Sequence, residues 1–192
     1  MSAGGARHWI LRAALAAAGA LAVTSAFGQG VLVDKSEIRF VSKQMGVNVE
    51  GRFRKWTANV VFMPSDLAHS KADFDIELAS IDLASAESES EVKGAVWFNT
   101  AKFPVAHFAS SSVKSVGADK YEFTGTLAIK GATRNAVVPV TLRKDAAGNN
   151  VAEGTFTVKR LEYKIGEGEW ADPSTVADDV AVRVRMVLAP AK

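Results

Sequence analysis

Apolar and polar residues alternate with a period of two over most of this chain, and this pattern restricts the folds open to it. In residues 121–129 the odd positions are Tyr, Phe, Gly, Leu and Ile, with Glu, Thr, Thr and Ala between them. Residues 72–78 alternate apolar side chains with Asp and Glu, and residues 180–188 place Val, Met and Leu at the even positions. Successive side chains of a strand point to opposite faces, so each run predicts a half-buried strand.

Turn-forming residues separate these runs at short intervals, as in Met45-Gly46 and Lys130-Gly131. Many short strands with one polar face predict an all-β sandwich or closed barrel. An eight-stranded barrel has an interior that is either filled by side chains or holds one small ligand. We expect strands near residues 36–42, 47–54, 56–63, 72–80, 105–116, 120–130, 134–143 and 151–160, and a ninth near 179–189.

One segment lacks the alternation. Residues 86–97, AESESEVKGAVW, place Val92, Val96 and Trp97 at the spacing of a short helical stripe. Ser88 or Ser90 is the predicted N-cap, because serine side chains accept hydrogen bonds from the first free amides of a helix. We expect this helix and the loop at 98–104 to plug one end of the sheet, to touch a ligand, or to do both.

The first thirty residues have the pattern of a secretory signal. Arg7 and Arg12 precede an uncharged run at 13–23, and the small residues Thr24-Ser25-Ala26 follow it. A basic segment, a short apolar run and a small-residue site are typical of a signal peptide, and the run is too short to span a bilayer. We therefore expect a signal peptide at 1–28, cleaved near 26–28, and a single exported domain at 29–192.

Removal of this segment changes the charge of the chain. The full sequence has 23 basic and 21 acidic residues, and the first 26 residues hold two Arg and no acid. The predicted mature chain is therefore neutral, which gives it no electrostatic reason to bind nucleic acid. The sequence has no Cys, so no disulfide stabilises the domain.

The sequence contains few of the motifs that are typical of enzymes, and we expect no catalytic residue, no metal site and no cofactor. It has no thiol nucleophile, no G-x-S-x-G and no phosphate-binding glycine motif. His69 lies in a polar turn, where solvent exposure is expected. His107 lies on an alternating run, where a hydrogen-bonded wall residue is the favoured interpretation.

The acidic stretch at 167–179 leaves three interpretations open: a calcium site, a catalytic pair of carboxylates, or a polar rim of the barrel. Its spacing does not match a calcium-binding loop. We favour the rim, with Trp170 packing across it and with Gly166 and Gly168 allowing sharp turns.

Five stretches, in order along the chain, resemble the YceI-like family of lipid-binding proteins. They are GVNVEGRF at 46–53, ASID at 79–82, WFN with KFP within 97–104, GTLAIKGATR at 125–134 and KRLEYKIG at 159–166. The resemblance implies an extended lipocalin-like antiparallel β-barrel of about eight strands, with one short helix plugging an end. It also implies a periplasmic protein that holds a long isoprenoid, of the polyprenyl or isoprenoid quinone type, and performs no reaction.

The resemblance suggests a membrane cytochrome of the b561 type as a protein partner, and a homodimer is a further candidate assembly. Two departures concern the polar end of the ligand. Many relatives carry a His where residues 43–45 read Lys-Gln-Met, and an Arg-Asp pair where residues 87–91 read Glu-Ser-Glu-Ser-Glu. If those positions orient a head group in relatives, the head group or its binding mode differs here.

Period-two parity and position near the helix select the side chains that we expect to line the isoprenoid tail. Aromatic walls suit such a chain, because burial of apolar surface drives its binding. The alternative function is a ligand-free secreted structural or interaction module associated with a membrane redox partner, which requires a filled lumen. Metal-assisted hydrolysis through the acidic stretch ranks third. The predicted tail-lining residues are Phe40, Phe53, Trp56, Phe62, Ile76, Trp97, Phe98, Phe108, Phe123, Leu127, Phe156 and Val182.

Cleavage of the predicted signal peptide during export should shorten the protein at its amino terminus. Amino-terminal sequencing of the protein recovered from a bacterial periplasm should find a chain that begins near Phe27 or Gln29. Recovery of a chain that still begins at Met1 would contradict the signal-peptide interpretation.

Overall fold

The computed structural model describes residues 30–189, and the predicted signal peptide lies outside the described residues. Ten antiparallel strands form one sheet in the order β3-β4-β6-β7-β8-β9-β10-β1-β2-β5. Their bounds are β1 Glu37–Gln44, β2 Val47–Phe53, β3 Trp56–Val61, β4 Lys71–Glu77, β5 Ile81–Asp82, β6 Val105–Gly117, β7 Lys120–Ile129, β8 Ala132–Lys144, β9 Asn150–Lys159 and β10 Asp179–Leu188.

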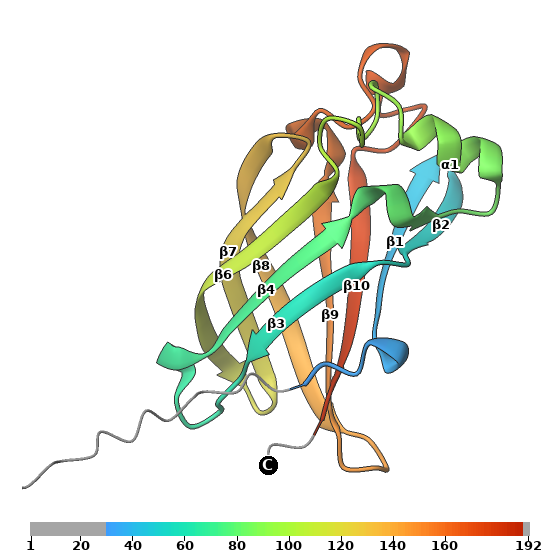
Figure 1. Ribbon diagram of the computed structural model, residues 1–192. Coiled ribbons are helices and arrows are strands. Elements are labelled where there is room, and N and C mark those ends of the chain that lie inside the picture. The colour runs from blue at the N-terminus through green and yellow to red at the C-terminus, as the bar shows by residue number, and fades with distance from the viewer. Residues whose placement is uncertain (1–29, 190–192) are drawn as a thin grey trace, which may run out of the picture.

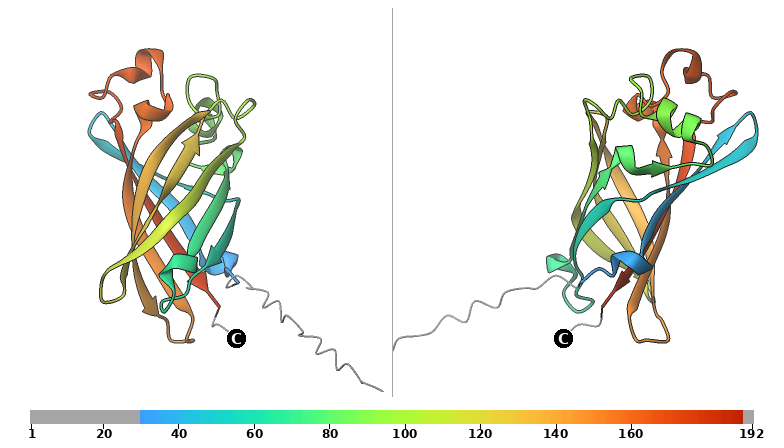
Figure 2. Two further views of the ribbon diagram at one scale, coloured as in Figure 1. Left: turned by 90° about the vertical axis from the view of Figure 1, so that its left-hand side faces the viewer. Right: turned by 45° about the vertical axis from the view of Figure 1, so that its right-hand side comes forward.

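The sheet curls into a half-barrel (Figures 1 and 2). Helix α1 (Ala86–Val92) lies at one end, beside the loop that carries the 3-10 turns η4 (Arg160–Tyr163) and η5 (Gly168–Ala171). The turn between β8 and β9 lies at the other end (Figure 1). We refer to these as the α1 end and the far end. Within residues 30–189 no helix is long and apolar enough to cross a bilayer.

The all-β prediction is confirmed, with differences in detail. All nine predicted strands are present, and β5 is an additional strand of two residues. The strand expected at 72–80 ends at Glu77, where the 3-10 turn η3 (Leu78–Ser80) begins. The helix ends at Val92 rather than near Trp97, and its N-cap is Ser85, not Ser88 or Ser90. The Ser85 hydroxyl accepts a hydrogen bond from the Ser88 amide at 3.2 Å, so the two predicted caps lie inside the helix.

A serine fastens the two edges of the curled sheet. The Lys55 amide donates to Ser80 Oγ at 3.0 Å, and the Arg54 amide donates to the Ser80 carbonyl at 3.1 Å. The Ser80 hydroxyl in turn donates to the Glu77 carbonyl at 2.6 Å. These bonds hold the turn between β2 and β3 against the segment that follows β4, and they explain why β4 ends early.

A bulge and a glycine sharpen the bend between β6 and β7. Their register shifts between Ser110 and Ser112, which leaves Ser111 as the extra residue of a bulge. Gly125 lies opposite Ser110, and a Cβ there would come 2.1 Å from the Ala109 carbonyl oxygen. The two backbones therefore approach more closely than any residue with a side chain would allow at this position.

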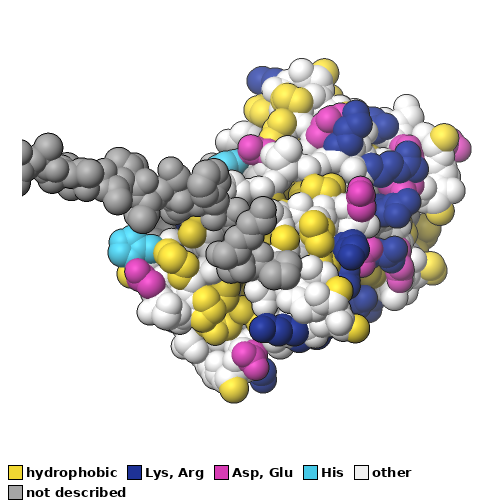
Figure 3. Space-filling model, turned by 60° about the horizontal axis from the view of Figure 1, so that its bottom comes forward, with side chains coloured by type: hydrophobic (Ala, Val, Ile, Leu, Met, Phe, Trp, Pro, Cys, Tyr) yellow, Lys and Arg dark blue, Asp and Glu magenta, His cyan; other side chains and the backbone are white. Residues whose placement is uncertain are grey.

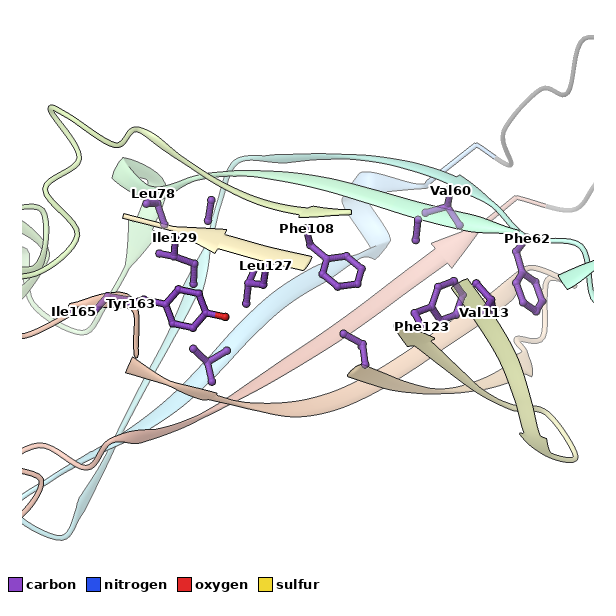
Figure 4. Packing of buried hydrophobic residues seen from close by; sticks show 14 of the residues in the cluster. Val60, Phe62, Leu78, Phe108, Val113, Phe123, Leu127, Ile129, Tyr163 and Ile165 are labelled. Carbon is purple, nitrogen blue, oxygen red and sulfur yellow. The ribbon is translucent and has the colours of Figure 1, made fainter. Parts of the chain in front are cut away.

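The alternation places the apolar faces inside the curl. On β7, Phe123, Leu127 and Ile129 are buried, whereas Thr126 is exposed. Figure 4 shows that Ile129 and Leu127 lie toward the α1 end with Tyr163 and Ile165, while Phe123 lies toward the far end. One continuous apolar lining thus runs along the lumen.

The far end of the molecule carries charges of both signs. Figure 3 shows Lys and Arg side chains interspersed with Asp and Glu on this face, beside scattered apolar groups. Interspersed charges are what a neutral chain predicts, and they create no extended field of one sign.

Substitution of Gly125 by Ala should destabilise the barrel, because its Cβ would also lie 2.7 Å from Ser110 Cα. Overpacking of this kind typically costs about 1–3 kcal/mol in the free energy of unfolding. Denaturant titration of Gly125→Ala should show that loss. Gly117→Ala is the matched control, because its Cβ would meet only the Lys120 side chain at 3.7 Å and beyond. Equal stabilities of the two variants would refute a special role for Gly125.

Candidate ligand-binding cavity

A cavity of about 340 Å³ runs inside the curled sheet. Its size is at the lower end of the roughly 300–1,000 Å³ typical of small-molecule pockets. Residues from β1, β4, β6, β7, β9 and β10 contribute apolar side chains to its wall. Ten of the twelve predicted tail-lining residues line it: Phe40, Phe53, Ile76, Trp97, Phe98, Phe108, Phe123, Leu127, Phe156 and Val182.

The other two predicted residues, Trp56 and Phe62, are not part of the cavity wall. Trp56 packs against Ile38 and Met186 in a separate buried cluster, between edge strand β3 and strands β1 and β10. The Phe62 ring packs edge-on against Tyr121, with centroids 4.9 Å apart, and belongs to the core at the far end. Parity assigns both side chains to the inner face, but it does not say how far along the barrel axis each one lies.

The cavity wall is polar at one end only. Its polar lining residues are Ser42 and Gln44 from the end of β1, Ser88 and Glu91 from α1, and Arg160. All of them belong to the α1 end, where the sheet gives way to the helix and loops (Figure 1). The sequence reasoning assigned none of them to the cavity. For Arg160 the one available signal was its place in the family-like stretch KRLEYKIG.

Arg160 organises the long loop between β9 and β10. Its side chain is buried, and Nε, Nη1 and Nη2 donate five hydrogen bonds to backbone carbonyls. A guanidinium has five N–H groups, so every donor is used. Burial lowers the pKa of the Arg160 guanidinium, and the nearby Asp178 charge acts in the opposite direction. The accepting carbonyls belong to Ile165, Gly166, Trp170, Val176 and Ala177.

Two tryptophan side chains pack together beside Arg160. The Trp97 and Trp170 rings lie 5.6 Å apart between centroids, and the Arg160 guanidinium lies 6.0 Å from the Trp97 ring. Gly166 has φ +73°, and a Cβ there would come 2.6 Å from Arg160 Nη1 and 3.0 Å from the Trp97 ring. Packing of Trp170 across the rim is thus confirmed, as is the need for glycine at this turn.

Lys130 ties the same region to the sheet. Its side chain is only 6% exposed, and its ammonium donates to the Val96 and Lys164 carbonyls. Its third partner is the Glu167 carboxylate, at 3.0 Å. One buried cation therefore joins the turn after β7, the segment after α1 and the long loop.

The acidic stretch is dispersed rather than gathered around one point. Glu167 pairs with Lys130, Asp179 pairs with Lys159 at 2.7 Å, and Asp178 accepts a hydrogen bond from the Leu161 amide. Asp172 accepts a bond from the Ser174 amide, which is the first cause of its lowered pKa. Within residues 30–189 no group of three or more His, Asp or Glu side chains could hold a metal ion. The arrangement agrees with a polar rim.

Both histidines of the described chain lie outside the cavity wall. His69 is exposed and its Nδ1 lies 2.7 Å from Asp66. His107 lies on β6, half exposed, with Nδ1 2.7 Å from Asp75 on the neighbouring strand β4. The hydrogen bond predicted for His107 is confirmed, and the side chain lies on the exposed face of β6, outside the cavity wall.

A curled antiparallel sheet around one apolar cavity, with a helix and loops at one end, defines the class of lipocalin-like barrels. Sequence comparison then gives the family. The profile described as the YceI-like domain matches residues 31–188, and the chain belongs to this family.

Individual relatives agree with this assignment. Protein YceI of Escherichia coli O157:H7 is 35% identical over 148 residues, which covers 71% of this chain and 73% of the relative. A relative from Azotobacter vinelandii is 34% identical over 88 residues, so the match spans about half of its length, 46%.

Solved structures show the same fold. The crystal structure of BcnA from Burkholderia cenocepacia superposes with a TM-score of 0.80 at 38% identity, covering 83% of this chain and 100% of that one. A polyisoprenoid binding domain from Saccharophagus degradans superposes with a TM-score of 0.67 at 15% identity, covering 85% of this chain and 99% of that one. At that identity the second likeness speaks to the fold alone.

Substitution of Arg160 by Lys should destabilise the protein, because an ammonium has three donors for five carbonyls. Each of the two buried carbonyls left without a partner costs about 1–3 kcal/mol, so a loss of roughly 2–6 kcal/mol in the free energy of unfolding is expected. Chemical denaturation measures it. Arg143→Lys is the matched control, because Arg143 makes an exposed pair with Glu153 and should tolerate the exchange. A wild-type stability for Arg160→Lys would refute the organising role.

Proposed function

We propose that this protein is a periplasmic carrier or scavenger that sequesters a long-chain isoprenoid lipid in its lumen. The observation that carries the proposal is the largely apolar cavity inside the sheet, to which ten of the aromatic and aliphatic side chains chosen by parity and by position near the helix contribute. The Saccharophagus degradans protein of the same fold is a polyisoprenoid binding domain, which supports the same ligand class. Membership of the YceI-like family supports it as well.

Burial of the tail supplies the affinity in this proposal. Removal of apolar surface from water is worth about 25 cal/mol per Å², so roughly 400 Å² of isoprenoid surface would contribute on the order of 10 kcal/mol before the costs of association. Side chains such as Phe108, Phe156 and Leu127 provide that contact surface without any charged group. Binding of this kind depends on the shape of the cavity and on the exclusion of water rather than on directional polar contacts.

We propose binding without catalytic turnover. The two buried cations at the α1 end, Arg160 and Lys130, are committed to backbone carbonyls and to Glu167. General acid–base catalysis needs a titratable group within hydrogen-bonding reach of a substrate atom. Glu91 is the one carboxylate among the cavity-lining residues. The other titratable lining residue is Arg160, whose N–H groups are all bound to carbonyls.

Two finer features belong to the proposal. The signal-like first thirty residues support a periplasmic location, and the proposed tail belongs to a polyprenyl compound or to an isoprenoid quinone. A quinone would make a b561-type membrane cytochrome a reasonable partner, and a homodimer would present two cavities. The cavity also argues against the structural alternative, which requires large side chains to meet across the axis and fill the lumen.

Substitution of Leu127 by Trp tests the cavity. Leu127 lies on the inner face of β7 and lines the lumen, so the added rings should occupy the path of the tail. Lipid that co-purifies with the wild-type protein, measured after organic extraction, should be lost in Leu127→Trp. The melting temperature should change little, because the added bulk fills space that the ligand would take.

Thr126→Trp is the matched control for this experiment. Thr126 is the preceding residue on the same strand and points outward, so the same bulk should leave lipid content unchanged. A packed lumen gives a different result: Leu127→Trp would cost about 1–3 kcal/mol by overpacking, and no lipid would be found in the wild-type protein. That pair of results would reject the carrier in favour of the structural module.

A further inference from the structure

The polar end of the cavity wall carries four side chains with unused hydrogen-bonding groups. Ser42 and Gln44 are two residues apart on β1, on the inner face that also presents Phe40 to the cavity. Ser88 and Glu91 are three residues apart on α1 and therefore share one face of the helix. Within residues 30–189 none of these four polar side chains has a hydrogen bond or an ion pair. A cavity that is apolar elsewhere thus offers free polar groups at one end only.

Contacts of the backbone bring the end of β1 and helix α1 to the same opening. Gln44 forms a β-bridge with Val176 in the long loop. Strand β5, which precedes α1, pairs with β2, and a Cβ at Gly51 of β2 would come 2.8 Å from the Leu83 side chain. Figures 1 and 2 show α1 beside the hairpin of β1 and β2. The four side chains therefore lie around one opening of the cavity, which we call the polar mouth: Ser42, Gln44, Ser88 and Glu91.

The charge at the polar mouth limits the head groups that fit there. Glu91 is exposed, and it is the one carboxylate among the cavity-lining residues. Arg160 is the one basic residue among them, and all five of its N–H groups are bound to carbonyls. A phosphate head would therefore face a like charge with no free cation in the cavity wall to balance it, and like-charge contact is costly.

The hydrogen-bonding groups of the polar mouth narrow the class further. A carboxylate only accepts hydrogen bonds, so Glu91 needs a donor in the ligand. The serine hydroxyls and the Gln44 amide both donate and accept. A hydroxyl group also does both, so it can use Glu91 and one of the other three side chains together. An ether or a ketone brings no donor for Glu91, and a hydrocarbon brings neither donor nor acceptor.

We propose that the polar mouth binds the hydroxyl group of an isoprenoid alcohol or quinol. The hydroxyl donates to the Glu91 carboxylate and accepts from Gln44 or from one of the two serines. The tail then runs toward Phe123, among the apolar lining residues of the far end. The polar mouth thereby selects hydroxyl-bearing isoprenoids over their ethers and over phosphorylated ones. This inference rests on the proposed carrier function and adds the head-group class and its orientation.

The test compares farnesol, farnesyl methyl ether and farnesyl phosphate, which share one isoprenoid tail, in calorimetric titrations of lipid-free protein. The wild-type protein should bind farnesol about five- to tenfold more tightly than the ether, which is the worth of one hydrogen bond at a site open to water. Farnesyl phosphate should bind more weakly than farnesol. Glu91→Gln removes the charge and keeps the shape, so it should reduce the preference for farnesol over the ether and raise the affinity for the phosphate.

Glu87→Gln is the matched control. Glu87 lies on the same helix and carries the same charge, but it does not line the cavity. This variant should keep both wild-type preferences. Equal changes in the two variants would show a general effect of helix charge and would reject binding by Glu91. Thermal melts of both variants establish that each is folded.

A second pair of ligands, a prenylated hydroquinone and its quinone, identifies the source of the hydroxyl. A preference for farnesol over its ether that Glu91→Gln reduces identifies an alcohol. A preference confined to the hydroquinone over the quinone, and reduced in the same variant, identifies a quinol. A preference in neither pair overturns the inference.

The remaining outcomes separate the two proposals. If none of these ligands binds the wild-type protein, the carrier function fails and the inference fails with it. If all of them bind with equal affinity to the wild-type protein and to Glu91→Gln, the carrier function stands and the role of the polar mouth is rejected. Tighter binding of farnesyl phosphate or of farnesylamine than of farnesol would overturn the hydroxyl in favour of a charged head group.

Discussion

The curvature of one antiparallel sheet creates both the core and the cavity of this protein. A flat sheet with the same alternation would leave its apolar face in water, whereas the curl turns the inner faces of β1, β7 and β10 toward a common axis. Gly125 and the bulge at Ser111 allow the chain to bend, and Ser80 fastens the edges where no ladder joins them. The apolar surface is then shared between packing and the cavity wall.

The α1 end follows a different principle, because irregular chain covers it. Backbone carbonyls of a loop need partners, and Arg160 and Lys130 supply them from inside. The result is a fixed polar cap over an apolar tube, with Trp97 between the two. A cavity wall that is apolar along most of its length and polar at one end suits an amphiphile with one long tail.

Local pattern in the sequence predicted the strands and most of the cavity wall, since parity assigns Phe123 and Leu127 to one face of a strand. It could not predict depth along the barrel axis, and for that reason Trp56 and Phe62 were placed in the wall when they belong to the packing around it. Arg160 was missed because its five acceptors come from a loop whose path is set by tertiary contacts. The N-cap at Ser85 was missed because three serines within six residues are equally good caps by sequence.

Native mass spectrometry of the protein, expressed with its own first thirty residues and released gently from the periplasm, is the most direct test of the carrier. The account predicts a second species, heavier than the protein by the mass of one isoprenoid, which organic extraction removes and tandem fragmentation identifies. Protein that is uniformly free of ligand, and that gains no mass when an isoprenoid with an oxygen-bearing head is supplied, would contradict it.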